Sequence, residues 1–388
     1  MSTTSCALTI LLTLCFATAC KTVIDRQDVR PKVLRDVPAR NLAYRLVPDV
    51  TAPPLDTDDP LEKFGPVATD FTTKRKDEAL VRTVVSPDKR RVLALYGTAD
   101  EPGSTFRIDL YNSDGQFLRN LVPPDIACVF PETVTWSPDG NYINFIARKR
   151  VMPSPTPTPE FEPEASASPA VPAPSLGPIF APVASFSTEQ IYICSRDGDD
   201  LKPLTGREGL IYFYFVWAPD GHALAALACK ENEWNVREQQ YKLPAGRPRL
   251  IAPDGSERLL DDNLTDALPV WSPDASKIAT AFETDLAIYD AGGKTPTQSR
   301  IPLRDQLIDA SVSFEQKTST KKANSNSTPA GTTPGVPPSF NPIVRLDWRK
   351  PESLYFQTAF IRVMPSETIN TFQRWHQLSL SAQAAILK

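Results

Sequence analysis

The sequence predicts an all-β fold, a β-propeller of six four-stranded blades that carries long disordered insertions. Three observations lead to this prediction: a turn motif recurs along the chain, a second hairpin follows the copies, and the copies are regularly spaced. The 388 residues include 39 prolines, 16 glycines and 41% hydrophobic side chains. This composition favours many turns and strands around a large core over long helices.

The recurring motif has the form Trp-Ser-Pro-Asp-Gly and separates two strand-like stretches. It reads VVSPD at 84–88, WSPDG at 136–140, WAPDG at 217–221 and WSPD at 271–274, and a degraded copy, DWRKP, occupies 347–351. Serine, a proline that fixes φ, aspartate and a glycine that accepts positive φ are the residues of a type I turn closing a hairpin.

The motif residues are expected to be structural. Each aspartate is expected to accept hydrogen bonds from nearby backbone N–H groups, and each tryptophan to pack between adjacent sheets. A ring of acids lining a channel is the alternative for the aspartates. The structural residues predicted in this way are Asp88, Asp139, Asp220, Asp274, Trp136, Trp217, Trp271 and Trp348.

The spacing of the motif gives the blade size. A hairpin with an Asp-Gly or Gly-Gly turn follows each of the first four copies, so each repeat has four strands. Ser137 follows Ser86 by 51 residues and Ser272 follows Ala218 by 54. Five blades are visible, and a sixth is expected from residues 41–80, with strands from both chain ends closing the ring.

This pattern resembles the WD40-like PD40 repeat of TolB-type six-bladed β-propellers over about residues 80–388. The first copy departs from it with Val85 in place of tryptophan, and the fourth with Ala275 in place of glycine. TolB proteins carry a sizeable α/β domain before the propeller, for which the residues after Cys20 are too few. The resemblance therefore implies the fold of residues 81–388, and the Tol–Pal role is not carried over.

The N-terminus resembles a bacterial lipoprotein signal. Residues 1–19 are predicted to be a signal peptide, because the uncharged apolar run from Ala7 to Ala19 ends in small residues directly before Cys20. The resemblance implies acylation of the Cys20 thiol and a membrane-attached, exported protein of the cell envelope, in the periplasm or on the outer membrane. Secretion without a lipid and an uncleaved anchor are the alternatives. Residues 20–40 are expected to form a flexible stalk.

Two biased segments are predicted to be disordered insertions in the propeller. Residues 151–186 hold ten prolines among Ser, Thr, Ala and Glu, and residues 315–340 are polar and rich in Ser and Thr. Each insertion is interpreted either as an arm that binds a partner or as a tolerated surface loop.

No catalytic or metal-binding motif is found in the sequence. There is no G-x-S-x-G elbow, and His222 and His376, the two histidines, are expected at the surface or rim. Residues 292–295 (GGKT) are interpreted as a hairpin turn, and the aspartates of SRDGDD (195–200) as a solvated turn. Cys128, Cys194 and Cys229 are interpreted as buried apolar residues, with one disulfide as the alternative.

These observations predict a non-catalytic, exported propeller that acts as a protein-binding scaffold, without cofactor or metal. The 42 basic and 46 acidic residues give a net charge of −4, which argues against nucleic acid as a partner. An envelope protein is the expected partner. One alternative is a carbohydrate- or peptidoglycan-binding propeller that exposes the aromatic residues 212–215 (YFYF), and another is a hydrolase or lyase using the propeller face.

Overall fold

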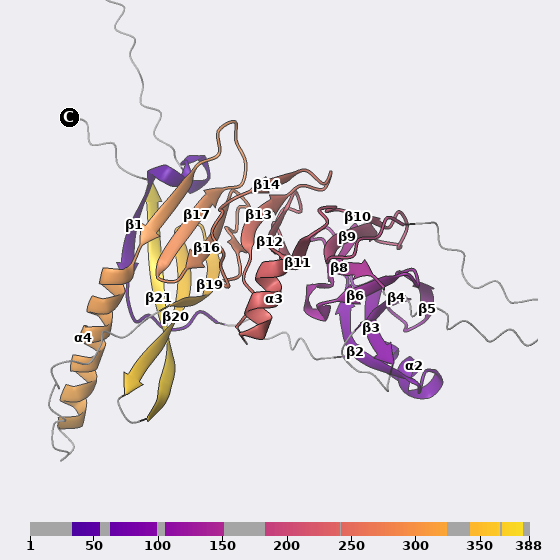
Figure 1. The fold of residues 1–388 in the computed structure, drawn as a ribbon, viewed down its shortest axis with the longest axis horizontal. Coiled ribbons are helices and arrows are strands. Elements are labelled where there is room, and N and C mark those ends of the chain that lie inside the picture. The colour runs from indigo at the N-terminus through magenta and orange to yellow at the C-terminus, as the bar shows by residue number, and fades with distance from the viewer. Residues whose placement is uncertain are drawn as a thin grey trace, which may run out of the picture.

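The chain folds into five antiparallel sheets that stand side by side in chain order (Figure 1). The all-β propeller prediction is therefore confirmed. The first and last sheets lie at opposite ends of the molecule, so the blades form an open arc (Figure 1). The computed structural model describes residues 33–54, 63–98, 105–150, 183–240, 242–323, 342–364 and 367–382.

Each sheet is built from strands that are close in sequence, except for one strand of the fifth. The first sheet contains β2 (Glu78–Val85), β3 (Arg91–Thr98), β4 (Arg107–Asn112) and β5 (Phe117–Asn120). The second contains β6 (Ile126–Val129), β7 (Thr135–Trp136), β8 (Tyr142–Lys149), β9 (Gln190–Ser195) and β10 (Lys202–Pro203). The third contains β11 (Leu210–Trp217), β12 (Leu224–Lys230), β13 (Arg247–Ile251) and β14 (Glu257–Leu259).

The fourth sheet contains β15 (Val270–Trp271), β16 (Lys277–Phe282), β17 (Asp285–Asp290) and β18 (Gln298–Pro302). The fifth contains β19 (Ile343–Lys350), β20 (Ser353–Met364), β21 (Glu367–Ala382) and β1 (Leu42–Val47). The α-helices are α2 (Gly65–Lys74), α3 (Glu231–Gln239) and α4 (Arg304–Ala323), and the 3-10 helices are η1 (Leu34–Asp36), η2 (Ala39–Asn41) and η3 (Pro131–Thr133).

The core lies between the sheets. Middle strands such as β12 are buried on both faces, which is why the sequence of β12, LAALACK, is a continuous apolar run and not the alternating pattern of a half-exposed strand. Hydrophobic clusters join the first sheet to the second, the second to the third, the third to the fourth and the fourth to the fifth. Among the described residues no cluster joins the fifth sheet to the first, which leaves the arc open.

The two chain ends meet in one sheet, but a sixth blade is absent from the described part of residues 41–80. Strand β1 pairs with β21, from Leu42 opposite Ala382 to Val47 opposite Gln377. The residues that follow form α2 instead of strands, because Val67 and Phe71 fall on one helical face and pack on the first sheet. The described residues thus form five sheets where six blades were predicted.

The predicted stalk and insertions differ in part from the structure. Residues 33–40 of the stalk are docked on the fourth sheet, and helix α4 extends through residues 315–323 of the second insertion. This helix starts by burying Leu307 and Ala310, and good helix formers such as Glu, Gln, Lys and Ala continue it. Residues 1–32, 151–182 and 324–341 lie outside the described residues.

The recurring motif forms the same hydrogen-bonded turn at the first, second and fourth copies. The serine hydroxyl donates to the aspartate carboxylate, at 2.6 Å for Ser86 and Asp88, 2.5 Å for Ser137 and Asp139, and 2.6 Å for Ser272 and Asp274. The N–H five residues after each serine donates to its hydroxyl at 2.9 Å. The fourth residue has positive φ, which Lys89 (59°) and Ala275 (58°) adopt in place of glycine.

We predict that Ser137→Ala lowers the free energy of unfolding by about 1–2 kcal/mol, since it removes a donor to Asp139 and the acceptor of the Tyr142 N–H. Urea unfolding measures the change. Ala218→Ser is the matched control, because the third copy lacks this hydroxyl, and it is expected to cost less than half as much. Equal stability of Ser137→Ala and the wild type would contradict this account of the turn.

Candidate functional site

The segment before the first sheet contacts three of the five sheets. We call residues 33–54 and 63–75 the N-terminal belt. The belt docks on the fourth sheet through η2, adds β1 to the fifth sheet, and then continues to α2 on the first sheet (Figure 1). It therefore links the two ends of the open arc.

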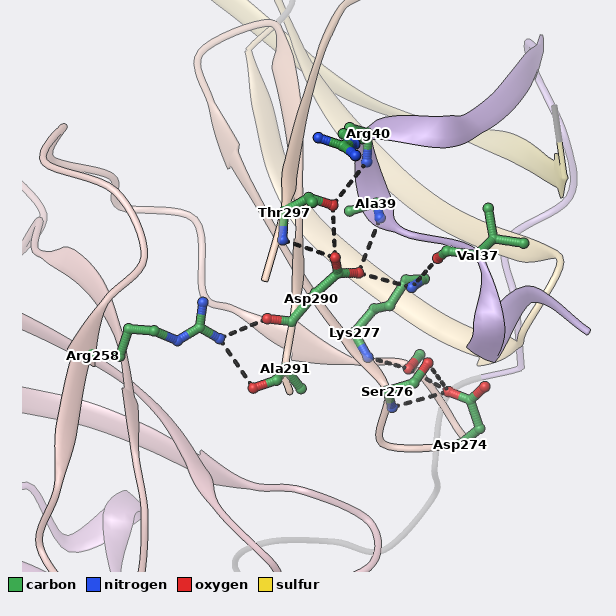
Figure 2. A network of polar contacts seen from close by, with 11 residues as sticks. Val37, Ala39, Arg40, Arg258, Asp274, Ser276, Lys277, Asp290, Ala291 and Thr297 are labelled. Atoms are coloured by element: carbon green, nitrogen blue, oxygen red, sulfur yellow. Dashed lines mark hydrogen bonds and ion pairs between the residues drawn. The ribbon is translucent and has the colours of Figure 1, made fainter. Parts of the chain in front are cut away.

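A buried ion pair holds the belt on the fourth sheet (Figure 2). Lys277 begins β16 and lies opposite Asp290 at the end of β17, with 3.0 Å between Nζ and Oδ1. The Lys277 ammonium also donates to the Val37 carbonyl at 2.6 Å, and the Ala39 N–H donates to Asp290 Oδ1 at 3.0 Å. Thr297 donates to Asp290 Oδ2 from its N–H at 2.9 Å and from its hydroxyl at 2.6 Å. We call Lys277, Asp290 and Thr297 the clamp.

The clamp binds main-chain atoms of the belt. Its third contact, from the Arg40 N–H to the Thr297 hydroxyl at 3.2 Å, is also to the backbone. Val37 and Ala39 bury their side chains in the core beside it, with 3% and 0% exposed. Since three polar contacts fix the path and two small apolar side chains fill the core, this stretch has one docked position.

Asp290 is held in its ionised form. Burial by itself would raise the pKa of this carboxyl, but the hydrogen bonds from Thr297 and the contact with Lys277 lower it below its usual range. Lys277 is 3% exposed, so its charge is compensated inside the protein and not by water. Removing either partner would leave the other charge buried and unpaired.

A cavity of about 560 Å³ lies beside the clamp. Its lining holds charges of both signs and one histidine, from Arg35, Asp36, Asp220, Lys277, Asp290, Lys294 and His222. The His222 ring contacts the Asp220 carboxylate and meets Trp271 edge-on, with 5.6 Å between ring centroids. Residues 292–295 form the hairpin loop between β17 and β18 at this cavity, as the turn interpretation expected.

A second polar group holds the belt on the fifth sheet. The Arg374 guanidinium pairs with both carboxylate oxygens of Asp49 at 2.7 Å, and it donates to the Ser311 hydroxyl of α4 at 3.0 Å. The same guanidinium lies 4.6 Å from the centre of the Phe314 ring. Arg374 therefore joins the belt, β21 and α4 at one point.

His376 is buried next to this group, so the prediction of a surface or rim position for it is wrong. The side chain is 1% exposed, because its position in β21 faces the fourth sheet together with Phe356. The Asp49 N–H donates to Nδ1 at 3.3 Å, which leaves the proton on Nε2 for the Thr358 hydroxyl at 3.1 Å. Burial and the Arg374 charge lower the pKa of His376 to about 4.

On the first sheet, α2 is held by aromatic and charged side chains. Arg75 pairs with the fully buried Asp109 at 2.7 Å and donates to the Tyr111 hydroxyl at 2.7 Å. Its guanidinium also lies 4.2 Å from the ring centres of Phe71 and Tyr96. These contacts cover the face of the first sheet that points away from the second sheet.

The predicted motif residues are spread over the turns and sheet interfaces, and they do not gather into one site. The aspartate carboxylates accept the N–H two residues on at 3.1–3.2 Å in each of the four turns, at Arg90, Asn141, His222 and Ser276. The four tryptophans lie in four different clusters between neighbouring sheets, Trp136, Trp217, Trp271 and Trp348. Cys20 lies outside the described residues.

Other residues singled out in the sequence are buried. Tyr212, Phe213 and Phe215 belong to β11 and are 0%, 8% and 5% exposed, so they form part of a packed strand and no open aromatic platform. Cys128, Cys194 and Cys229 are free and buried, and burial raises the pKa of the Cys194 and Cys229 thiols to about 12. His222, by contrast, is exposed at the surface.

Neither a candidate metal site nor a candidate membrane-spanning helix lies in the described residues. No group of three His, Cys, Asp or Glu side chains suited to a metal ion is found there. In the same part of the chain no helix has the length and apolar character needed to cross a membrane.

The belt was not found by sequence reasoning, because its partners lie far along the chain. Ala39 and Asp290 are 251 residues apart, and Asp49 and Arg374 are 325 apart. One local signal was available, since a lysine that starts the strand KIATAF, in which Thr280 is the one other polar residue, needs a buried partner.

Comparison with solved structures shows distant likenesses. No family model and no curated protein matches the chain. Similar solved structures include an oligogalacturonate lyase in complex with manganese (11% identity, TM-score 0.37, 77% of this chain and 65% of that one). They also include prolyl oligopeptidase B from Galerina marginata (9% identity, TM-score 0.42, 76% of this chain and 34% of that one). A third is a nidogen/laminin complex (11% identity, TM-score 0.33, 77% of this chain and 83% of that one). The chain thus spans 65% of the lyase and about a third of the peptidase, and none of these likenesses bears on its function.

We predict that Lys277→Met destabilises the protein by about 3–5 kcal/mol, because Asp290 keeps a buried charge without its partner. Amide hydrogen exchange should also become faster at residues 37–41 than in the wild type. Lys294→Met, at an exposed lysine of the cavity beside the clamp, is the control. It should leave the free energy of unfolding and the exchange rates at residues 37–41 unchanged. Unchanged exchange at 37–41 in Lys277→Met would show that the clamp does not hold the belt.

We also predict that stability falls by up to about 3 kcal/mol as the pH is lowered from 6.5 to 4. Unfolded His376 takes up a proton near pH 6.5 but the folded form only near 4, so in this window the unfolded state holds more protons. The difference between wild type and His376→Gln in urea unfolding isolates this contribution. It should be largest at neutral pH and shrink toward pH 4, and a difference that is constant with pH would refute the assignment.

Proposed function

We propose that this chain is a non-catalytic, exported, lipid-anchored propeller that acts as a protein-binding scaffold in a bacterial cell envelope. The anchor is the Cys20 thiol, at the end of the apolar segment that resembles a lipoprotein signal. The folded body is an arc of sheets with large side surfaces, an architecture that serves many binding roles.

The docked belt is the observation that carries this proposal. Val37 and Ala39 are fixed on the fourth sheet and β1 on the fifth, so the chain from Cys20 arrives at that end of the arc. The stretch from Cys20 to Val33 spans at most about 45 Å when fully extended. An anchor at Cys20 would hold the fourth and fifth sheets near the membrane, and the first sheet lies at the other end of the arc (Figure 1).

A belt that is fixed in this way gives the arc a defined end toward the membrane. A scaffold benefits from this arrangement, because tethering raises the effective concentration of a partner on the same membrane. The carbohydrate-binding alternative relied on exposed residues 212–215, and three of the four are buried in β11. Residues 212–215 therefore do not form the exposed aromatic surface that this alternative expected.

We predict that Cys20→Ala moves the protein from the membrane fraction to the soluble fraction of the envelope, because the acylated thiol is its proposed membrane contact. Fractionation of cells that produce each form measures this, with Cys15→Ala, inside the same apolar segment, as the matched control. Membrane retention of Cys20→Ala would contradict the lipid anchor.

Crosslinked capture of the membrane-bound wild type should yield a stoichiometric protein partner, and the absence of such a partner would contradict the scaffold function.

A further inference from the structure

The fifth sheet has one face that points away from the fourth sheet. Directly paired residues of an antiparallel sheet share a face, so the register defines it. One row contains Arg345, Gln357 and Trp375, the next contains Asp347, Tyr355, Gln377 and Val47, and a third contains Ser353, Ser379 and Arg45. We call these residues the outer face.

The outer face differs from the opposite face of the same sheet. Leu346, Phe356, Leu354 and Leu378 lie on that opposite face and belong to the core shared with the fourth sheet. None of the hydrophobic clusters of the described residues includes Tyr355 or Trp375. At the other end of the arc, α2 covers the corresponding face of the first sheet (Figure 1).

The outer face is ordered by contacts between its own side chains and by one contact with Gln373 of β21. Gln357 donates to the Gln373 side chain at 2.8 Å, and Gln377 donates to the Ser353 hydroxyl at 2.9 Å. The Arg345 guanidinium lies 6.0 Å from the centre of the Trp375 ring. Side chains that are already held in place lose little conformational entropy when a partner binds.

The composition and charge of the outer face indicate what it binds. Trp, Tyr and Arg are the residue types that carry most binding energy in protein interfaces. Arg45 and Arg345 are exposed, while Asp347 is already paired with Arg349 at 2.9 Å, so the face is positive on a chain of net charge −4. Charge complementarity therefore favours an acidic partner surface.

We propose that the outer face is the docking surface for the acidic surface of a protein partner. This inference rests on the scaffold function proposed above and names its binding surface. Four strands about 4.8 Å apart and some six residues long give a face on the order of 400 Å². This is about half the area that each partner buries in a stable complex of standard size, so the contact is reversible and depends on charge.

The test uses a photo-crosslinking amino acid in the full-length, membrane-bound protein. Placed at Tyr355, it should give one covalent protein adduct in cells, and placed at Tyr142, 44% exposed on the second sheet, it should give none. In the Tyr355 form, Arg45→Glu with Arg345→Glu should reduce the adduct about tenfold, because both charges then repel an acidic surface. Arg45→Lys with Arg345→Lys should retain it, and an unchanged melting temperature shows that each variant folds.

The outcomes separate this inference from the proposed function. An adduct at Tyr355 that charge reversal removes and lysine retains supports the acidic partner. An adduct at Tyr355 that charge reversal leaves unchanged overturns the acidic partner, and a protein adduct at Tyr142 alone overturns the surface while the scaffold function stands. If neither position gives a protein adduct and capture of the wild type yields no partner, or only a glycan, the scaffold function fails as well.

Discussion

Face-to-face packing of sheets is the constraint on which the rest of this structure depends. A strand buried on both faces needs an apolar layer on each side, and a sheet in the middle of the arc receives both layers from its neighbours. The first and fifth sheets each have one neighbour, because the described residues do not close a ring. The two ends differ, because α2 covers the first sheet, whereas the fifth sheet presents a polar and aromatic face.

The N-terminal belt follows from the same constraint. It supplies the fourth strand of the last sheet and the helix that covers the first, so its two described stretches complete both ends of the arc. The clamp of Lys277 and Asp290 is a buried ion pair, and such pairs contribute less to net stability than to the choice of one arrangement. By holding the Val37 carbonyl and the Ala39 N–H, the clamp sets the position from which β1 starts.

Sequence reasoning predicted the parts of the fold that depend on interactions between residues close together in the chain. The turns at Ser137 and Ser272 follow from side chains within five residues, so their motif predicts them. The number of sheets, the docking of the belt and the burial of His376 were missed, since each depends on contacts between residues more than 200 positions apart or on which face of a strand is covered. Helix α2 (residues 65–74) was not predicted, because strands of a sixth blade were expected there and the helix buries only two apolar side chains.

The solvent accessibility of the outer face of the fifth sheet tests the open arc most directly. Hydroxyl-radical footprinting of the full-length protein measures how fast individual aromatic side chains are oxidised. The account predicts that the half-buried Tyr355 and Trp375 are oxidised more slowly than exposed Tyr142 but clearly faster than the fully buried Tyr192 and Phe356. Protection of Tyr355 and Trp375 to the level of Tyr192 in the protein without a partner would mean that another layer packs on the fifth sheet, and it would contradict the open arc.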